Sequence, residues 1–365
     1  MLFKVLSPRA LKTAARDLAI LVLLAAAAEL ALRLLAPAYG HKIFDNLYTG
    51  SYPIGANADG YRGPAEPPQK PAGQLRILTL GDSETFGTGV PADRTWPAQL
   101  GQELSQRRPA SVVINGGLEG FGLRDIAQAW RDKWRAYAPD VVVIGVTASM
   151  ISLEVARPEI LTFEQVAHQH GAAPSGLERL KLSALRAYHS LYVVGFISVT
   201  AQRALYWCGL LDHRLNPHMP FGHLLAYGWS QGDVPAGLAR DAWSRFAADY
   251  KAFAAEVEAT GARLAVVWLP PRFDLSDSWR DNQKNIQKER FTLEPARELE
   301  SIARGSGARF VNLLPALLDA RAAAAAQHRY APLYIHFDDV HLDEEGSHVA
   351  ARAIADALSP PEARP

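Results

Sequence analysis

The sequence predicts an α/β fold built on a parallel β-sheet, and three observations lead to this prediction. Short apolar runs alternate with longer segments of helical spacing between Arg76 and Leu358, a pattern typical of right-handed βαβ units. The run at 140–144 is almost entirely apolar, as in a strand that is buried on both faces. Small residues that favour turns follow two of the apolar runs, at Gly81 and at Gly116.

The apolar runs are expected to form strands, and the segments between them are expected to form helices. The expected strands are 77–80, 112–115, 140–144, 263–269 and 309–313. The expected helices are 96–107, 123–137, 238–259, 291–304, 316–327 and 348–358. Because the carboxyl ends of parallel strands share one edge of a sheet, the residues that follow these strands should meet at that edge.

Composition changes along the 365-residue chain predict its domain organisation. The expected parts are an N-terminal anchor at 1–37, an extended tether at 38–75, a large α/β domain at 76–358 and a tail at 359–365. Within the domain, 151–237 is long for a connection between a strand and its helix, so we expect it to hold a helical cap or insertion. Residues 60–63 of the tether could instead lie over the domain and close an edge.

The first part of the chain resembles a membrane anchor. Basic residues, among them Lys12 and Arg16, precede an apolar stretch at 18–36 that is about long enough to cross a bilayer. Because basic flanks stay on the cytoplasmic side, we expect a cytoplasmic N-terminus and an extracytoplasmic, periplasmic domain. Glu29 and Arg33 interrupt the apolar stretch four residues apart, so they share a helix face and could pair.

Two other interpretations of this segment stay open. It could be a cleaved signal peptide with the small residues 26–28 at the cleavage site, or an amphipathic helix packed on a partner. We favour the uncleaved anchor because apolar character resumes at 30–36. A second stretch, 191–211, is also apolar, but Gln202 and Arg203 in its middle favour a buried or interfacial helix over a second span.

A candidate nucleophile follows the first expected strand. The strand at 77–80 runs directly into Gly81, Asp82 and Ser83. A serine at the exit of a strand, beside a helix, can present its hydroxyl clear of the sheet with backbone N–H groups close by. A Gly-Asp-Ser triplet also occurs in ordinary turns, so it indicates a catalytic serine only if the chain also supplies a general base.

That partner is found near the C-terminus, where Asp338 precedes His341 by three residues. A serine hydroxyl is a weak nucleophile unless a base removes its proton. Histidine suits this task because its pKa is ordinarily near 6.5, and a carboxylate can hold the imidazole in one tautomer. An acidic surface turn that caps a helix is the alternative for this segment alone.

Together these motifs resemble the SGNH/GDSL hydrolase family. The resemblance depends on the segments 76–87, 115–120 and 338–346, and it covers the chain from about 60 to 358 with a less typical middle. It implies a three-layer α/β/α sandwich with a parallel, flavodoxin-like five-stranded sheet. It also implies acyl-transfer chemistry on esters without a cofactor.

The resemblance also implies roles for single residues. Ser83 matches the nucleophile, and its N–H and that of Gly120 match the backbone donors of the oxyanion hole. His341 matches the base and Asp338 the residue that orients it, with Asp339 as the less favoured alternative. The glycines around Gly120 would let backbone N–H groups approach an oxyanion closely.

One position departs from the family pattern. Where the family has an asparagine amide after the third strand, we align Ser149 of this chain. A serine hydroxyl is shorter than an asparagine amide, and it can donate only one hydrogen bond. Loss of one oxyanion donor costs about 2.7–4 kcal/mol, so the sequence allows a slow hydrolase, a rearranged oxyanion hole or an inactive relative.

Composition narrows the choice of ligands and partners. Lys and Arg together number 38, as do Asp and Glu, so net charge gives no reason to expect nucleic acid. The histidines of the insertion lack ligand spacing, so no metal site is predicted; they are His168, His170, His189, His213, His218 and His223. The single cysteine, Cys208, excludes an internal disulfide, and we expect it to be buried.

The sequence therefore predicts a membrane-anchored serine esterase or acyltransferase with an extracytoplasmic domain. Its substrate would carry an ester, such as an O-acyl group of an envelope polysaccharide, a small molecule or a lipid. The alternative is a weakly active or inactive binding subunit of an envelope assembly, with protein partners in the envelope.

Overall fold

The computed structural model describes most of the domain, the N-terminal helix and scattered residues of the insertion. The described residues are 8–35, 57–165, 176, 177, 180, 184, 191–194, 196, 197, 200, 208, 237–275, 294–329, 331, 333–335 and 340–359.

The centre of the domain is a parallel five-stranded sheet with the order β2-β1-β3-β4-β5. Its strands are β1 (Leu75–Leu80), β2 (Ser111–Asn115), β3 (Val141–Val146), β4 (Arg263–Trp268) and β5 (Arg309–Asn312). The residues of β3 are all buried, as expected for a central strand covered on both faces. The predicted α/β fold with five parallel strands is confirmed.

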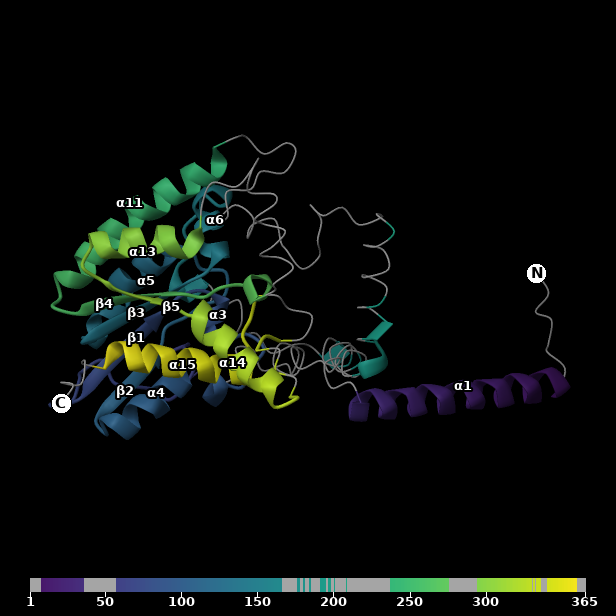
Figure 1. Cartoon of the computed structure of the whole chain (residues 1–365). Coiled ribbons are helices and arrows are strands. Elements are labelled where there is room, and N and C mark those ends of the chain that lie inside the picture. The colour runs from purple at the N-terminus through teal and green to yellow at the C-terminus, as the bar shows by residue number, and fades with distance from the viewer. Residues whose placement is uncertain are drawn as a thin grey trace.

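Helices cover both faces of the sheet and make three layers (Figure 1). One face is covered by α5 (Leu123–Asp132), α6 (Ala148–Ala156), α11 (Leu238–Glu258) and α13 (Pro295–Gly305). The other face is covered by α4 (Trp96–Arg107), α14 (Leu314–Ala326) and α15 (Glu344–Leu358). Each face has its own apolar core, so the sheet separates two clusters of buried side chains.

Three helices differ by several residues from their predictions, and one of them, the predicted helix 291–304, begins only at Pro295 as α13. The predicted helix 123–137 ends at Asp132 and continues as the 3₁₀ turn η3 (Trp134–Tyr137), because Lys133 leaves helical geometry with φ −133° and ψ −60°. The predicted helix 348–358 begins one turn earlier, at Glu344, since the Asp343 side chain accepts a hydrogen bond from the Gly346 N–H at 2.8 Å.

Part of the expected tether packs on the domain. Tyr61 and Arg62 are buried, and Arg62 forms an antiparallel bridge with Asn115, the last residue of β2. The Tyr61 ring meets the Trp134 ring edge-on at 5.4 Å between centroids. Of the two alternatives left open by the sequence, residues 60–63 therefore lie over the domain rather than forming part of an extended tether.

The first residues of the predicted insertion form part of a helix beside the sheet. Residues 151–156 belong to α6. Ile151 is fully buried in the apolar core between the sheet and the helices α5, α6, α11 and α13. Cys208, expected to be buried, is exposed, because it lies in the insertion rather than in either core. Most of 166–236, with its six histidines, and the tail 360–365 lie outside the described residues.

The N-terminal segment forms one long helix, α1 (Pro8–Leu35). Among the described residues, Lys12–Leu35 is the one helix long and apolar enough to cross a membrane, and no residue of it is buried. Glu29 and Arg33 pair as predicted, with 2.7 Å between Arg33 Nε and Glu29 Oε1.

The contact between α6 and α11 contains a buried acidic residue, Glu154. Its Oε2 lies 3.4 Å from Arg124 Nε on α5. Burial, together with the hydrogen bond and the charge of Asp249 on α11, raises the pKa of Glu154 to about 7, although the Arg124 charge opposes the rise.

This raised pKa should make the folded domain less stable as the pH rises. Between the ordinary pKa of 4.5 and the folded value of about 7, the folded state holds a proton that the unfolded chain releases. The free energy of unfolding should therefore fall by up to about 3 kcal/mol from pH 4.5 to pH 8. Glu154→Gln should remove this fall in melting curves, whereas Glu256→Gln, in an exposed ion pair on α11, should keep it. An unchanged pH profile in Glu154→Gln would contradict the assignment.

Candidate active site

Ser83 is the first residue of the short helix α3 (Ser83–Phe86), directly after β1. Asp82 caps this helix by accepting a hydrogen bond from the Glu84 N–H at 3.0 Å. The turn needs glycine at Gly81, since a Cβ there would collide with the Thr85 side chain and lie 2.9 Å from the Gly145 carbonyl. The turn thus holds the half-buried Ser83 at the carboxyl edge of the sheet.

His341 lies in a loop that the chain folds tightly before α15. Tyr334 and Leu342 form an antiparallel bridge, and the Ile335 N–H donates to the His341 carbonyl at 2.9 Å. The Leu342 N–H donates to the buried Glu84 carboxylate at 3.3 Å, which ties this loop to α3. A Cβ at Gly346 would collide with the Leu333 carbonyl, so glycine is required for this close approach.

These two elements bring the Ser83 hydroxyl and the His341 ring together. Ser83 Oγ lies 2.8 Å from His341 Nε2, although the residues are 258 positions apart in the chain. This is hydrogen-bond distance for a hydroxyl and a ring nitrogen. With the Nδ1–H tautomer, Nε2 can accept the hydroxyl proton, and that is the geometry of a nucleophile with its general base.

Ser149 meets the carboxylate beside the nucleophile. Its Oγ donates to Asp82 Oδ2 at 3.0 Å and lies 2.7 Å from Thr147 Oγ1, which itself donates to Asp82 Oδ2 at 2.5 Å. Burial raises the pKa of Asp82, while the hydrogen bonds from Thr147, the Glu84 N–H and Ser149 oppose the rise. In this arrangement the single hydroxyl proton of Ser149 points to Asp82.

Thr147, which the sequence analysis missed, is the first residue after β3. It also caps α6, because its Oγ1 accepts a hydrogen bond from the Met150 N–H. We expected the strand to end at 144, whereas it continues to Val146, so Thr147 is the residue that directly follows it. Ser149 was chosen from its position in the family motif, which gave no reason to consider Thr147. A threonine just before a helical segment is a cap signal that could have located it.

Gly120 lies in the loop that follows β2, and this loop is fixed against α3. The Leu118 N–H donates to the Gly81 carbonyl at 3.1 Å, and a Cβ on Gly117 would collide with the Phe86 N–H. Gly120 has φ +72° and is exposed. Its N–H donates to no acceptor among the residues the structure describes, so it is available to a ligand.

An ion pair between the half-buried Arg157 and the buried Asp125 supports the Gly120 turn. Arg157 donates from Nη1 to the Gly120 carbonyl at 2.9 Å and pairs through Nη2 with the buried Asp125 carboxylate. Asp125 in turn accepts from the Gly122 N–H and the Leu161 N–H, both at 2.6 Å. These two residues were missed, because a single Asp and a single Arg 32 positions apart give no signal in the sequence.

Arg62 supports the other end of α3. Its guanidinium donates to the carbonyls of Phe86, Gly87 and Val90, at 3.2, 2.5 and 2.8 Å. The last carbonyls of a helix have no partner within the helix, so these bonds stabilise the helix that carries Ser83. The remaining predicted site residues, Asp338 and Asp339, lie outside the described residues.

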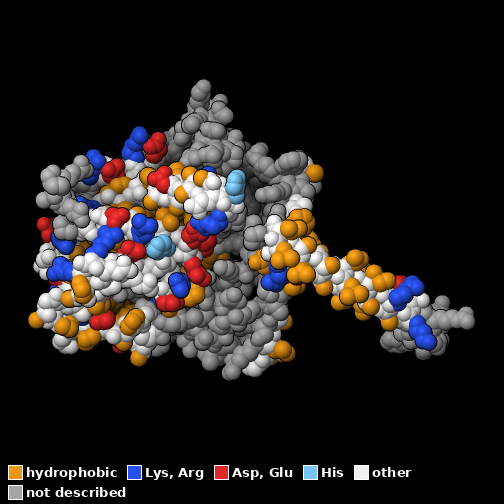
Figure 2. Space-filling model, turned by 60° about the horizontal axis from the view of Figure 1, so that its bottom comes forward, with side chains coloured by type: hydrophobic (Ala, Val, Ile, Leu, Met, Phe, Trp, Pro, Cys, Tyr) orange, Lys and Arg blue, Asp and Glu red, His pale blue; other side chains and the backbone are white. Residues whose placement is uncertain are grey.

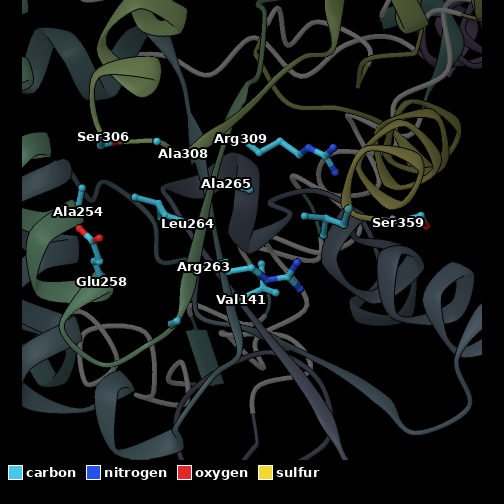
Figure 3. Close-up of a pocket in the computed structure, with 13 residues that line it drawn as sticks. Val141, Ala254, Glu258, Arg263, Leu264, Ala265, Ser306, Ala308, Arg309 and Ser359 are labelled. Atoms are coloured by element: carbon cyan, nitrogen blue, oxygen red, sulfur yellow. The ribbon is translucent and has the colours of Figure 1, made fainter. Parts of the chain in front are cut away.

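A pocket opens at the opposite edge of the sheet and is distinct from this site. Figure 3 shows it at the starts of the strands, with Val141, Arg263 and Arg309 in its lining. The Ser83–His341 pair lies instead at the carboxyl edge, where open α/β sheets bind their ligands.

No protein-family model matches the chain, and no curated protein matches it. Solved structures do match it. A catalytic mutant of Axe2, an acetylxylan esterase from Geobacillus stearothermophilus, has a TM-score of 0.41 at 13% identity, over 80% of this chain and 97% of that one. The acetyl xylan esterase AlAXEase has a TM-score of 0.43 at 12% identity, over 78% of this chain and 100% of that one.

A G-D-S-L family protein from Desulfitobacterium hafniense DCB-2 has a TM-score of 0.41 at 15% identity, over 78% of this chain and 100% of that one. The chemistry of the site depends on the chain's own side chains, above all Ser83 and His341.

Proposed function

We propose that this protein is a serine esterase or acyltransferase of the SGNH type, held in a membrane by α1. The observation that carries the proposal is the 2.8 Å contact between Ser83 Oγ and His341 Nε2 at the carboxyl edge of the sheet. Both side chains are half-exposed, so a substrate can reach them.

In the proposed reaction, Ser83 Oγ attacks the acyl carbonyl carbon while its proton passes to His341 Nε2. The tetrahedral intermediate then collapses, and the leaving alcohol takes that proton as the ester bond breaks. Water or a second alcohol next attacks the acyl-serine while His341 accepts its proton, and His341 returns that proton to Ser83 Oγ as the bond between Oγ and the acyl carbon breaks. The first acceptor gives hydrolysis, and the second gives acyl transfer. Asp338 would hold the Nδ1–H of His341 throughout.

The oxyanion of this intermediate would be bound by the N–H groups of Ser83 and Gly120. The first N–H groups of a helix have no acceptor within the helix, so the Ser83 N–H is suited to this role. Ser149 would assist only if its hydroxyl turned away from Asp82, to which it donates in the structure. We therefore propose Thr147 and Ser149 as supports for Asp82, with Ser149 as an occasional third donor.

Arg157→Gln should lower kcat by roughly tenfold to a hundredfold while changing KM little. The Gly120 carbonyl loses its charged donor, and a displacement of about 1 Å in the oxyanion loop is enough for such a loss. Kinetics with p-nitrophenyl acetate test this, with Arg131→Gln as the control because Arg131 pairs with Glu256 away from the loop. Equal kcat values for the two variants would contradict the role of Arg157.

The proposed anchor suggests where the substrate lies. With the basic flank of α1 in the cytoplasm, the domain would face the extracytoplasmic side, and envelope polysaccharides or lipids with O-acyl groups would be within reach. Acyl transfer rather than hydrolysis would be favoured if the insertion excludes water from the acyl-serine.

A second candidate function is a binding subunit with little turnover. The observation that favours it is the engagement of Ser149 with Asp82, which leaves two backbone donors, rather than three donors, for an oxyanion. Such a subunit would use the same edge of the sheet to hold an acylated glycan.

A fluorophosphonate probe separates these functions, because it reacts only with an activated serine. Phosphonylation of Ser83 Oγ with release of fluoride should occur in the full-length protein and should be lost in both Ser83→Ala and His341→Ala. Ser105→Ala, on the exposed side of α4, should label like the natural protein. If the natural protein does not label, the esterase proposal fails and the binding subunit is favoured.

A further inference from the structure

Exposed large apolar side chains are confined to two parts of the described chain. They lie on α1 and within residues 160–197, whereas the described remainder of the domain contributes none. Besides Ile160, those within the insertion are Leu177, Leu180, Leu191, Phe196 and Ile197, with exposures from 40% to 79%. Figure 2 shows apolar side chains along α1 and on the part of the molecule next to it. Water-facing surfaces rarely carry such a concentration of apolar groups.

A polar contact joins these two parts. The Glu29 carboxylate of α1 accepts hydrogen bonds from the N–H groups of Tyr192 and Val193, at 3.1 and 3.0 Å. Arg33 pairs with Glu29 and lies over the Tyr192 ring, 4.7 Å from its centroid. The described turn at Tyr192 and Val193 is therefore attached to α1 through the Glu29–Arg33 pair.

This contact has the properties expected close to lipid. Backbone N–H groups need an acceptor from the protein wherever water is scarce, and Glu29 supplies one to two neighbouring N–H groups. Glu29 is six residues before the end of α1, or about 9 Å along the helix, which places it in the outer part of a spanning segment. Tyr192 and Arg33 are of the types that lie at the membrane interface.

We propose that the exposed insertion residues Leu177, Leu180, Leu191 and Ile197 lie in the outer leaflet of the bilayer that α1 crosses, and that Glu29 docks the described turn at Tyr192 and Val193 on α1. Lipid, continuous with the lipid around α1, would contact these four side chains. This inference needs α1 to cross a membrane, as proposed above, but it does not depend on the chemistry of Ser83. The domain would then be held close to the membrane at two points, rather than by a single helix.

Fluorescence quenching by spin-labelled lipid tests this proposal in the full-length protein. The native cysteine is first removed by Cys208→Ser. Single cysteines are then introduced by Leu180→Cys or Ile197→Cys and labelled with an environment-sensitive dye. Each labelled protein is placed in nanodiscs that hold one copy of it. Leu30→Cys on α1 is the lipid-facing control, and Gln102→Cys on α4 is the water-facing control.

The expected result is a loss of fluorescence at Leu180→Cys and Ile197→Cys equal to that at Leu30→Cys, with no loss at Gln102→Cys. Glu29→Leu should reduce the loss at Ile197→Cys, and Glu29→Gln, which keeps an acceptor oxygen, should reduce it less. Three results would overturn the inference: insertion dyes that behave like Gln102→Cys, dyes shielded from water but not quenched by lipid, or quenching unaffected by Glu29→Leu. Absence of quenching at Leu30→Cys would show instead that the anchor itself is wrong.

Discussion

Ser83→Ala, His341→Ala and the double variant should all lower kcat by a similar factor, at least about a thousandfold. The reason is the 2.8 Å contact between the hydroxyl and the ring, since each group contributes to the rate only through the other. Turnover of p-nitrophenyl acetate by the full-length protein in detergent measures this. Residual activity above the uncatalysed rate should persist, because the oxyanion donors stay in place.

The double variant is the informative one. If the two losses multiply, Ser83 and His341 act independently, and a nucleophile–base pair is excluded. Ser105→Ala provides the matched serine control, because this exposed side chain on α4 donates only to the Gln102 carbonyl. It should retain full activity.

Gly117→Ala should lower the free energy of unfolding by about 3 kcal/mol or more. The added Cβ would collide with the Phe86 N–H and come within 2.7 Å of the Thr85 carbonyl carbon. Because these are backbone atoms, no change of rotamer relieves the collision. The loop after β2, which carries Gly117 and Gly120, would have to move away from α3.

Thermal melting and kcat should both report this separation. Gly101→Ala, in the middle of α4, is the matched control. A Cβ at Gly101 makes only an ordinary 3.5 Å contact with the Val113 side chain of β2. That change should stabilise the protein by about 0.5–1 kcal/mol, as alanine does in place of glycine within a helix. A Gly117→Ala variant that melts like the natural protein would show that the loop does not need its close contact with α3.

The sequence by itself was sufficient to predict the sheet and most of its helices. Apolar periodicity is a local property, so the run at 140–144 was sufficient to predict a strand buried on both faces, which the structure shows as β3 at Val141–Val146. Ser83 and His341 could also be singled out, because each follows a local turn pattern. Their 2.8 Å approach then follows from parallel strands that end at one edge.

Only the tertiary structure decided which polar groups support the site. Thr147 rather than Ser149 directly follows β3, and both hydroxyls point to Asp82 because the turn after β1 lies beside the turn after β3. Arg157 and Asp125 meet behind Gly120 through the packing of separate segments. The partner of a polar side chain depends on which distant segment comes within about 3 Å of it, and no local pattern of the sequence records that distance.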